Sequence, residues 1–306
     1  ELIQAGDYES MVLVYQPYID GLRDNKFRSS ALMLMGHFGT EGELYDDARA
    51  AYSALLDEYG QPNPLDKEGK PIPVPAAERL RPGTRWNGVR RLPPEDLDPG
   101  KIRYALGYLF WKKFDWAGSR RALQPFFDDP GLRNHESCPA ALLMLARSNV
   151  RLDAFDAAIP VFERLVTDHS GFAAADEAYV GLVRTCYRAR NWGKMRAHSA
   201  AFTKLRPNAV RRPYVDFYLA LAMIETGDAT AGHSKLRDLA QAETYGDLKA
   251  DAHFHLARRA LAQSPPDRAA AYKLLRRSID FYPRAEPLLE AGRCAVELRR
   301  WDDARA

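Results

Sequence analysis

One phrase recurs along the chain about every 37 residues, and it constrains the fold more than any other feature. Most copies have a helix-ending turn, an aromatic residue and then a small residue three positions later. In six copies the aromatic residue is Tyr8, Tyr45, Trp116, Phe155, Trp192 or Trp301, and in the other two Ala229 and Arg268 occupy the same position. Successive spacings from Trp116 onward are 39, 37, 37, 39 and 33 residues. This regularity predicts an array of similar units, each packed on its neighbours.

Each unit contains two stretches with the periodicity of an amphipathic helix. The first stretch repeats apolar residues, as in Tyr179, Leu182, Val183 and Cys186. The second carries a small residue and then bulky ones four and seven positions later: Ala48, Tyr52, Leu55; Ala158, Phe162, Leu165; Ala271, Leu275, Ser278. A small residue at a helix crossing lets two backbones approach, so we predict a stack of two-helix hairpins.

Two consequences follow from this hairpin prediction. Removing a core side chain such as Phe162 or Leu165 should cost about 3 to 5 kcal/mol. Prolines inside two second helices, Pro17 and Pro125, should bend or end those helices because proline lacks a backbone N–H.

The recurring phrase resembles the tetratricopeptide repeat (TPR). Leu106-Gly107-Tyr108 with Phe114-Asp115-Trp116 is similar to the first helix and turn of that repeat, and Asp153–Ala158 to the start of its second helix. The resemblance implies an all-α, right-handed superhelical α-solenoid of helix-turn-helix hairpins. Residues 1–59 would form the first and second repeats, and residues 101–306 the third to eighth repeats, with the first and last repeats incomplete.

Residues 60–100 interrupt the repeat and hold nine of the chain's 20 prolines. Such density excludes a regular helix and predicts an extended, Pro/Arg-rich insertion. Its basic residues surround a tryptophan: Arg79, Arg81, Arg85, Trp86, Arg90 and Arg91. One interpretation is a docking arm for a protein partner, since arginine and tryptophan are frequent interface anchors. The alternative is a loop packed along its own solenoid.

The resemblance also implies a partner-binding groove, because the first helices of TPR proteins line the concave face. Carried over position by position, the predicted groove residues are Tyr104, Tyr108, Trp111, Lys112, Arg147, Arg151, Arg184, Tyr187, Arg188, Phe217, Phe254, Arg258 and Arg293. Arginines with interleaved aromatic rings suit acidic or extended protein segments. The competing interpretation is a solvated arginine-rich helix face.

Other classes of function find little support in the sequence. No nucleophile elbow, phosphate-binding loop or zinc-protease motif is present, so we predict neither catalysis nor a cofactor. His135, Glu136 and Cys138 form the one compact ligand-like set, but no second cluster completes a metal site. A net charge of +3 is too small to predict nucleic-acid binding, and no apolar run is long enough for a transmembrane segment.

The sequence therefore predicts a non-enzymatic scaffold that binds or organises partner proteins through the concave face and the insertion. Two alternatives stay open: the regulatory or targeting region of a larger enzyme, and a structural subunit of a multiprotein assembly. Unit ends such as Leu55-Leu56-Asp57-Glu58-Tyr59 are similar to TPR proteins of the bacterial envelope. That similarity points to the envelope or periplasm of a bacterium rather than to the cytoplasm.

Overall fold

The structure is a computed structural model that describes residues 7–8, 10–11, 13–14, 28–59, 98–243 and 245–305. These residues form helices and no β-strand, which confirms the predicted all-α fold. The chain divides into two compact units, Glu1–Val161 and Phe162–Ala306. Pro17 and the six predicted residues of the insertion lie outside the described residues, so those predictions stay open.

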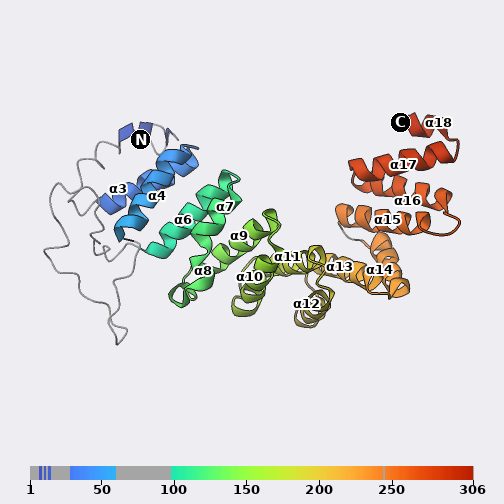
Figure 1. Cartoon of the computed structure of the whole chain (residues 1–306), viewed down its shortest axis with the longest axis horizontal. Helices are drawn as coiled ribbons and strands as arrows, with labels where there is room; N and C mark the ends of the chain where they lie inside the picture. Colours follow the sequence, from blue (N-terminus) through green and yellow to red (C-terminus); the bar gives the residue numbers. More distant parts are fainter. Residues whose placement is uncertain are drawn as a thin grey trace. The chain divides into compact units, whose positions relative to one another are not determined.

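Unit 1 is a series of antiparallel hairpins in which each helix packs on the next (Figure 1). Its helices are α3 (Arg28–Glu41), α4 (Tyr45–Tyr59), α6 (Pro99–Lys112), α7 (Trp116–Leu123), α8 (Pro125–Asp128), η1 (Pro130–Leu132) and α9 (Cys138–Arg151), followed by the start of α10 (Phe155–Asp168). Helix α6 begins two residues earlier than the predicted restart of the repeat at residue 101. Asp98 caps it by accepting hydrogen bonds from the Gly100 and Lys101 N–H groups.

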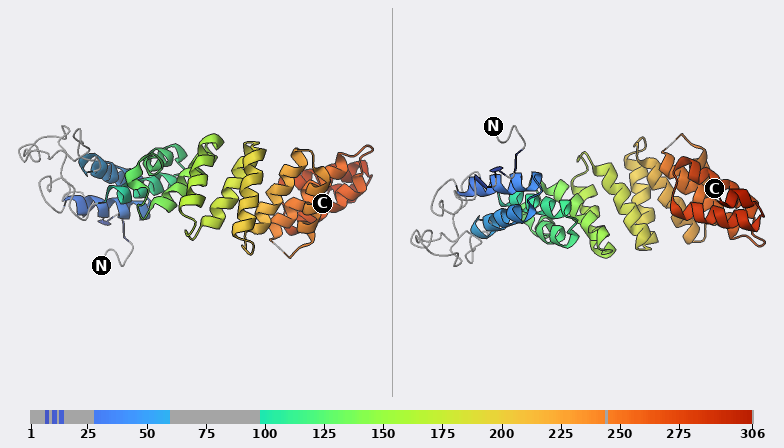
Figure 2. Two further views of the ribbon diagram at one scale, coloured as in Figure 1. Left: turned by 90° about the horizontal axis from the view of Figure 1, so that it is seen from below. Right: turned by 90° about the horizontal axis from the view of Figure 1, so that it is seen from above.

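Unit 2 continues the same pattern after the second half of α10. Its helices are α11 (Ala175–Arg188), α12 (Trp192–Leu205), α13 (Arg212–Glu225), α14 (Ala229–Gln241), α15 (Gly246–Leu261), α16 (Arg268–Phe281), α17 (Ala285–Glu297) and α18 (Trp301–Arg305). In Figure 2 the orange and red helices α15, α16 and α17 lie side by side, and their contacts confirm this packing. The odd-numbered helices α11, α13, α15 and α17 are the first helices of their hairpins.

The residues predicted to form the core do so. Ala158, Phe162 and Leu165 of α10 are buried, as are Tyr179 and Leu182 of α11. The small residues also act as expected: a Cβ atom on Gly232 would lie 2.6 Å from the Ala220 carbonyl oxygen. Helix α14 thus approaches the backbone of α13 more closely than any side chain would allow.

The predicted break at Pro125 is confirmed, because α7 ends at Leu123 and the short helix α8 starts at Pro125. A third interior proline, Pro160, lies within α10, and the helix runs through it without interruption. Proline in a second helix therefore does not by itself end that helix.

The turns between paired helices share one backbone conformation. A residue with positive φ follows the first helix at Glu43, Phe114, Asp153, Arg190, Gly227 and Arg299. In five of these turns the next N–H group donates to a carbonyl five residues back, as Asn191 does to Cys186 at 2.8 Å. This is the Schellman arrangement that ends many helices. In two of these turns the same next residue also caps the second helix with its side chain: Asp115 accepts from the Gly118 N–H and Asn191 from the Lys194 N–H.

Replacing Arg190 with glycine is expected to stabilise unit 2 by about 0.5 to 1 kcal/mol. The φ of 54° at Arg190 strains an L-residue by about 1 kcal/mol or more, partly offset by the greater freedom of glycine in the unfolded chain. Ala189, with φ −75°, is the matched control, and glycine there should destabilise by a similar amount. Urea unfolding of both variants measures the change in the free energy of unfolding. If both glycine substitutions stabilised the protein, or both destabilised it, by the same amount, the prediction would be contradicted.

Candidate functional site

The first helices of unit 2 bring together a partly exposed row of arginine, tyrosine and histidine side chains. Helix α11 packs against α13, and α13 packs against α15, in addition to the contacts within each hairpin. Residues at matching positions on these helices therefore become neighbours although they are about 37 residues apart in sequence. We call Arg184, Tyr187, Tyr218, His255 and Arg258 the first-helix row.

Aromatic contacts connect this row across the three helices. The rings of Tyr187 on α11 and Tyr218 on α13 have centroids 5.7 Å apart. Phe217, next to Tyr218, has its ring 5.6 Å from His255 on α15. Contacts of this kind fix the side chains in place, so the row is a pre-formed surface that loses little conformational freedom on binding.

The environment keeps the tyrosine and histidine of the row uncharged. Burial raises the pKa of Tyr218 to about 12, despite the charge and hydrogen bond of Arg184. Burial, together with the nearby Arg258 and Arg284, lowers the pKa of His255 to about 4. At neutral pH the row thus presents hydroxyl and imidazole hydrogen-bonding groups beside permanently charged guanidinium groups.

Two acidic residues lie beside the row. Asp251 on α15 forms an ion pair with Arg284, and burial raises its pKa while Arg284 offsets part of that rise. Glu286 on α17 is 4.0 Å from Arg258, with both side chains more than half exposed. An ion pair that exposed is worth about 0 to 1 kcal/mol, so Glu286 competes only weakly with an incoming carboxylate.

Most groove residues predicted for unit 2 lie on the exposed face of the first helices, but two do not. Arg184, Arg188, Arg258 and Arg293 are exposed and Tyr187 is half-buried. Phe217 and Phe254 are only 4% and 6% exposed and belong to hydrophobic clusters, which corrects their assignment as contact residues. The surface positions belong instead to the residues that follow them, Tyr218 and His255.

Four residues at or beside the row were not predicted from the sequence: Tyr218, Asp251, His255 and Arg284. The sequence contained a pattern that could have identified two of them, because Tyr218 and His255 are separated by 37 residues, the length of the repeat. Helical periodicity assigns the buried face of a helix only to within about one residue. Here a shift of one residue exchanges the buried Phe217 and Phe254 for the partly exposed Tyr218 and His255.

In unit 1 the predicted groove residues lie on α6 and α9. Trp111 packs edge-on against Trp116 at 4.7 Å, and the Arg151 guanidinium is 5.7 Å from that same Trp116 ring. Lys112 donates to the Thr40 carbonyl at 3.4 Å, and its Nζ is 6.0 Å from the Tyr108 ring. Tyr104 is partly buried, which raises its pKa, and Arg147 is half-buried. Trp111, Lys112 and Arg151 thus contact other groups of unit 1.

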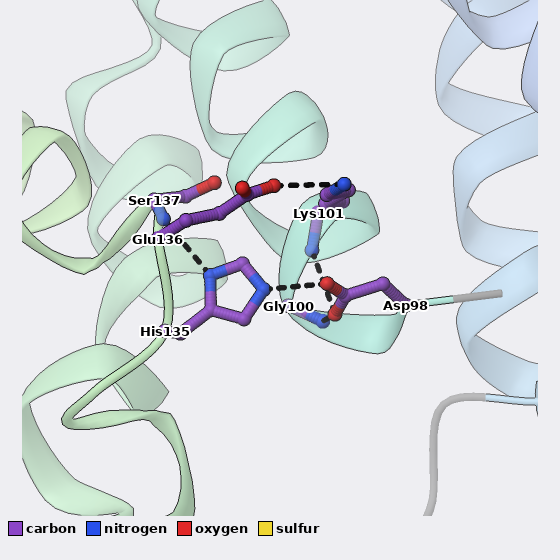
Figure 3. A network of polar contacts seen from close by, with 6 residues as sticks. All are labelled: Asp98, Gly100, Lys101, His135, Glu136 and Ser137. Carbon is purple, nitrogen blue, oxygen red and sulfur yellow. Dashed lines mark hydrogen bonds and ion pairs between the residues drawn. The ribbon is translucent and has the colours of Figure 1, made fainter. Parts of the chain in front are cut away.

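A second polar cluster lies where the chain leaves the insertion (Figure 3). His135 Nε2 is 2.7 Å from Asp98 Oδ2, and His135 Nδ1 accepts from the Ser137 N–H at 3.0 Å. Because Nδ1 is an acceptor, the proton sits on Nε2 and is donated to Asp98. A Cβ atom on Gly100 would lie 2.5 Å from His135 Nε2, so glycine makes this approach possible.

The three residues considered as metal ligands are thus engaged separately. His135 binds Asp98, Glu136 pairs with Lys101 at 2.7 Å, and the buried Cys138 thiol is 3.9 Å from the Phe126 carbonyl. Within the described part of the chain, no group of three His, Cys, Asp or Glu residues is placed to hold a metal ion. Over the same residues, no helix is both long and apolar enough to cross a membrane.

Replacing Asp98 with asparagine should destabilise unit 1 near neutral pH but not in strong acid. Burial by itself would raise the Asp98 pKa, but hydrogen bonds from His135, Gly100 and Lys101 outweigh it and lower the pKa. A carboxyl group with a lowered folded pKa stabilises above its unfolded pKa of about 3.9 and loses that effect as pH falls through the folded value. In urea unfolding, the difference between the two proteins should shrink below about pH 4; a difference constant from pH 6 to pH 2.5 would contradict this account.

No protein-family model and no curated protein sequence matches this chain. Solved structures do: the C-terminal part of a TPR repeat-containing protein from Cytophaga hutchinsonii superposes with a TM-score of 0.56 at 12% identity, covering 94% of this chain and 96% of that one. At this identity the match shows the fold alone, and that fold is TPR-like.

Two further structures superpose less closely. A tetratricopeptide repeat protein from Parabacteroides merdae has a TM-score of 0.45 at 11% identity, with 100% and 95% of the two chains covered. The human IFIT1 dimer with m7Gppp-AAAA has a TM-score of 0.41 at 11% identity, with 99% and 64% covered. Scores this low support no inference about function, so the absence of nucleic-acid binding stays a prediction.

Proposed function

We propose that this chain, whose fold is TPR-like, is a protein-interaction scaffold that binds an extended acidic segment of a partner along the first-helix row. The single observation that supports this most is the row itself: two exposed arginines flank connected tyrosine and histidine side chains on three packed first helices. A TPR-like fold is consistent with such a role, and no chemistry of the chain's own is required.

The partner's character follows from the groups in the row. Guanidinium groups bind carboxylates through paired, charge-assisted hydrogen bonds. The rings of Tyr187 and Tyr218 supply apolar surface on which the partner backbone or an aromatic side chain packs. Neutral His255 and Tyr218 add hydrogen bonds without adding charge, so they favour backbone carbonyl groups between the acidic residues.

Geometry sets the spacing of the acidic residues. Arg184 on α11 and Arg258 on α15 are two helices apart, and neighbouring packed helices lie about 8 to 10 Å from each other. A separation of about 20 Å corresponds to about six residues of extended chain. The preferred segment therefore carries two carboxylates about six residues apart, with an aromatic or aliphatic residue between them.

The test uses a fluorescein-labelled extended peptide with two glutamates six residues apart and a central phenylalanine, measured by fluorescence anisotropy. The double variant Arg184→Glu/Arg258→Glu is expected to weaken binding by at least about tenfold, because each charge-assisted bond is worth about 1.5 to 3 kcal/mol. Arg120→Glu/Arg121→Glu on α7 is the matched control, since both residues are exposed and the net charge changes equally. It should bind within about twofold of the unsubstituted protein.

Two outcomes would reject this function. The first is equal binding of a peptide with glutamine in place of both glutamates, and the second is an equal loss of affinity in the α7 control variant. The Pro/Arg-rich insertion, including Trp86, is proposed as a second contact for the same partner. Deletion of residues 60–97 should then weaken binding of a full partner protein while leaving the short peptide's affinity unchanged.

A further inference from the structure

A pocket in unit 2 lies away from the first-helix row. It has a volume of about 340 Å³ and is lined by Ala240, Gln241, His253, Arg277, Asp280 and Phe281. These residues come from the end of α14, the middle of α15 and the end of α16. That volume lies at the small end of the range for pockets that bind small molecules or single side chains.

His253 is the unusual group in this pocket. Its side chain is 5% exposed, and its Nδ1 atom is buried without a hydrogen-bond partner among the described residues. His255, two residues later, contacts Phe217 of α13 instead, so the two histidines lie on different faces of α15, as a helical spacing of two requires. A buried nitrogen without a hydrogen-bond partner costs about 1 to 3 kcal/mol, which a ligand that hydrogen-bonds to that Nδ1 atom would partly offset.

The imidazole is held in a fixed orientation. Its ring lies parallel to that of Phe281, with an angle of 4° and centroids 5.8 Å apart. The Lys249 Nζ lies 5.2 Å from the Phe281 ring. Phe281 and the Ala240 methyl group give the pocket an apolar wall, so an apolar body fits beside a polar group.

The charges around the pocket favour an anion. Burial lowers the pKa of His253, and Arg277 and Lys249 lower it further, so the potential at the imidazole is positive and the ring is neutral at pH 7. Arg277 forms no ion pair within 4.0 Å in the described part of the chain. Asp280 is the one acidic residue of the lining, and it lies three residues after Arg277 on the same face of α16.

We propose that this pocket binds a carboxylate carried on a small apolar body, with Arg277 and His253 contacting the carboxylate and Phe281 packing against the apolar part. The source of that group is either a free carboxylic acid or the C-terminal residue of a peptide. Asp280 weakens the site through like-charge repulsion, and Gln241 supplies an amide at the rim. This site is independent of the function proposed for the first-helix row.

The test follows the His253 Cε1–H resonance by NMR while benzoate is added, with benzamide as the neutral isostere. Benzoate should shift that resonance to saturation and benzamide should not. Arg277→Gln should weaken benzoate binding by at least about tenfold, the loss expected for one charge-assisted contact. Arg276→Gln is the matched control, because this neighbouring residue is exposed and outside the lining; it should bind normally. Asp280→Asn should bind more tightly.

A second arm compares a peptide ending in phenylalanine as the free acid with the same peptide amidated. Saturation by the free-acid peptide at lower concentration than benzoate would identify a chain end as the ligand, whereas weaker binding would favour a free acid. A non-saturating benzoate shift, equal shifts with benzamide, or equal effects of the Arg276 and Arg277 variants would overturn the proposal. None of these outcomes bears on the first-helix row.

Discussion

Replacement of Phe162 with alanine is expected to lower the free energy of unfolding of unit 2 by about 3 to 5 kcal/mol, the range for a large buried aromatic residue. Phe162 is 2% exposed, and its ring fills the space left by a glycine: a Cβ atom on Gly181 would lie 2.8 Å from Phe162 Cζ. Truncation leaves a cavity between α10 and α11 that neither helix can fill without moving.

The control for this change within unit 2 is Leu205→Ala, because the Leu205 side chain is 66% exposed. Its cost should stay within about 0.5 kcal/mol, as for most surface substitutions. Chemical denaturation followed by circular dichroism measures both. In a repeat array the core variant should also broaden or split the transition, since each hairpin is stabilised only by its neighbours. A single sharp transition unaffected by Phe162→Ala would contradict the hairpin-stack account.

The same substitution, glycine to alanine, is expected to have opposite effects at two positions. At Gly107 on α6 a new Cβ atom would lie 2.4 Å from both Cγ and Cδ2 of Leu123 on α7, within a buried interface. Neither atom can yield without disturbing the packing, so Gly107→Ala should destabilise unit 1 by about 1 to 3 kcal/mol. At Gly193 on α12 no atom lies within 4 Å of the position that a Cβ atom would take, so Gly193→Ala should stabilise by about 0.5 to 1 kcal/mol.

Thermal or urea unfolding of the two variants provides the comparison. Opposite signs are the expected result, because helix propensity improves at both positions and only Gly107 has an obstructing side chain. A stabilising Gly107→Ala would show that α6 and α7 pack less closely than described, and the small residue would then have no structural role in that hairpin.

The core was predictable because it depends on local periodicity. Apolar residues spaced three and four apart mark the buried face of each helix, and a repeat of about 37 residues averages out errors in any one copy. The buried positions of Ala158, Phe162 and Leu165 could therefore be named from the sequence. The break at Pro125 was also local, since it follows from a missing N–H group.

The candidate sites depended on contacts between distant residues and were predicted only in part. Exposed arginines at matching repeat positions were identified, but Phe217 and Phe254 are buried, and the partly exposed positions belong to the next residues, Tyr218 and His255. The Asp98–His135 contact joins residues 37 positions apart through a loop and a helix start that share no periodicity. The His253 pocket forms only when α14, α15 and α16 pack together, and no sequence pattern marks it.

The most direct test of the central claim is to map backbone amide shifts by NMR while the two-glutamate peptide is added. Binding along the first-helix row predicts perturbations centred on α11, α13 and α15, at and around Arg184, Tyr218 and Arg258, with small changes on the second helices α12 and α14. Perturbations centred on the second helices, or none at saturating peptide, would contradict the claim that this face is the partner-binding surface.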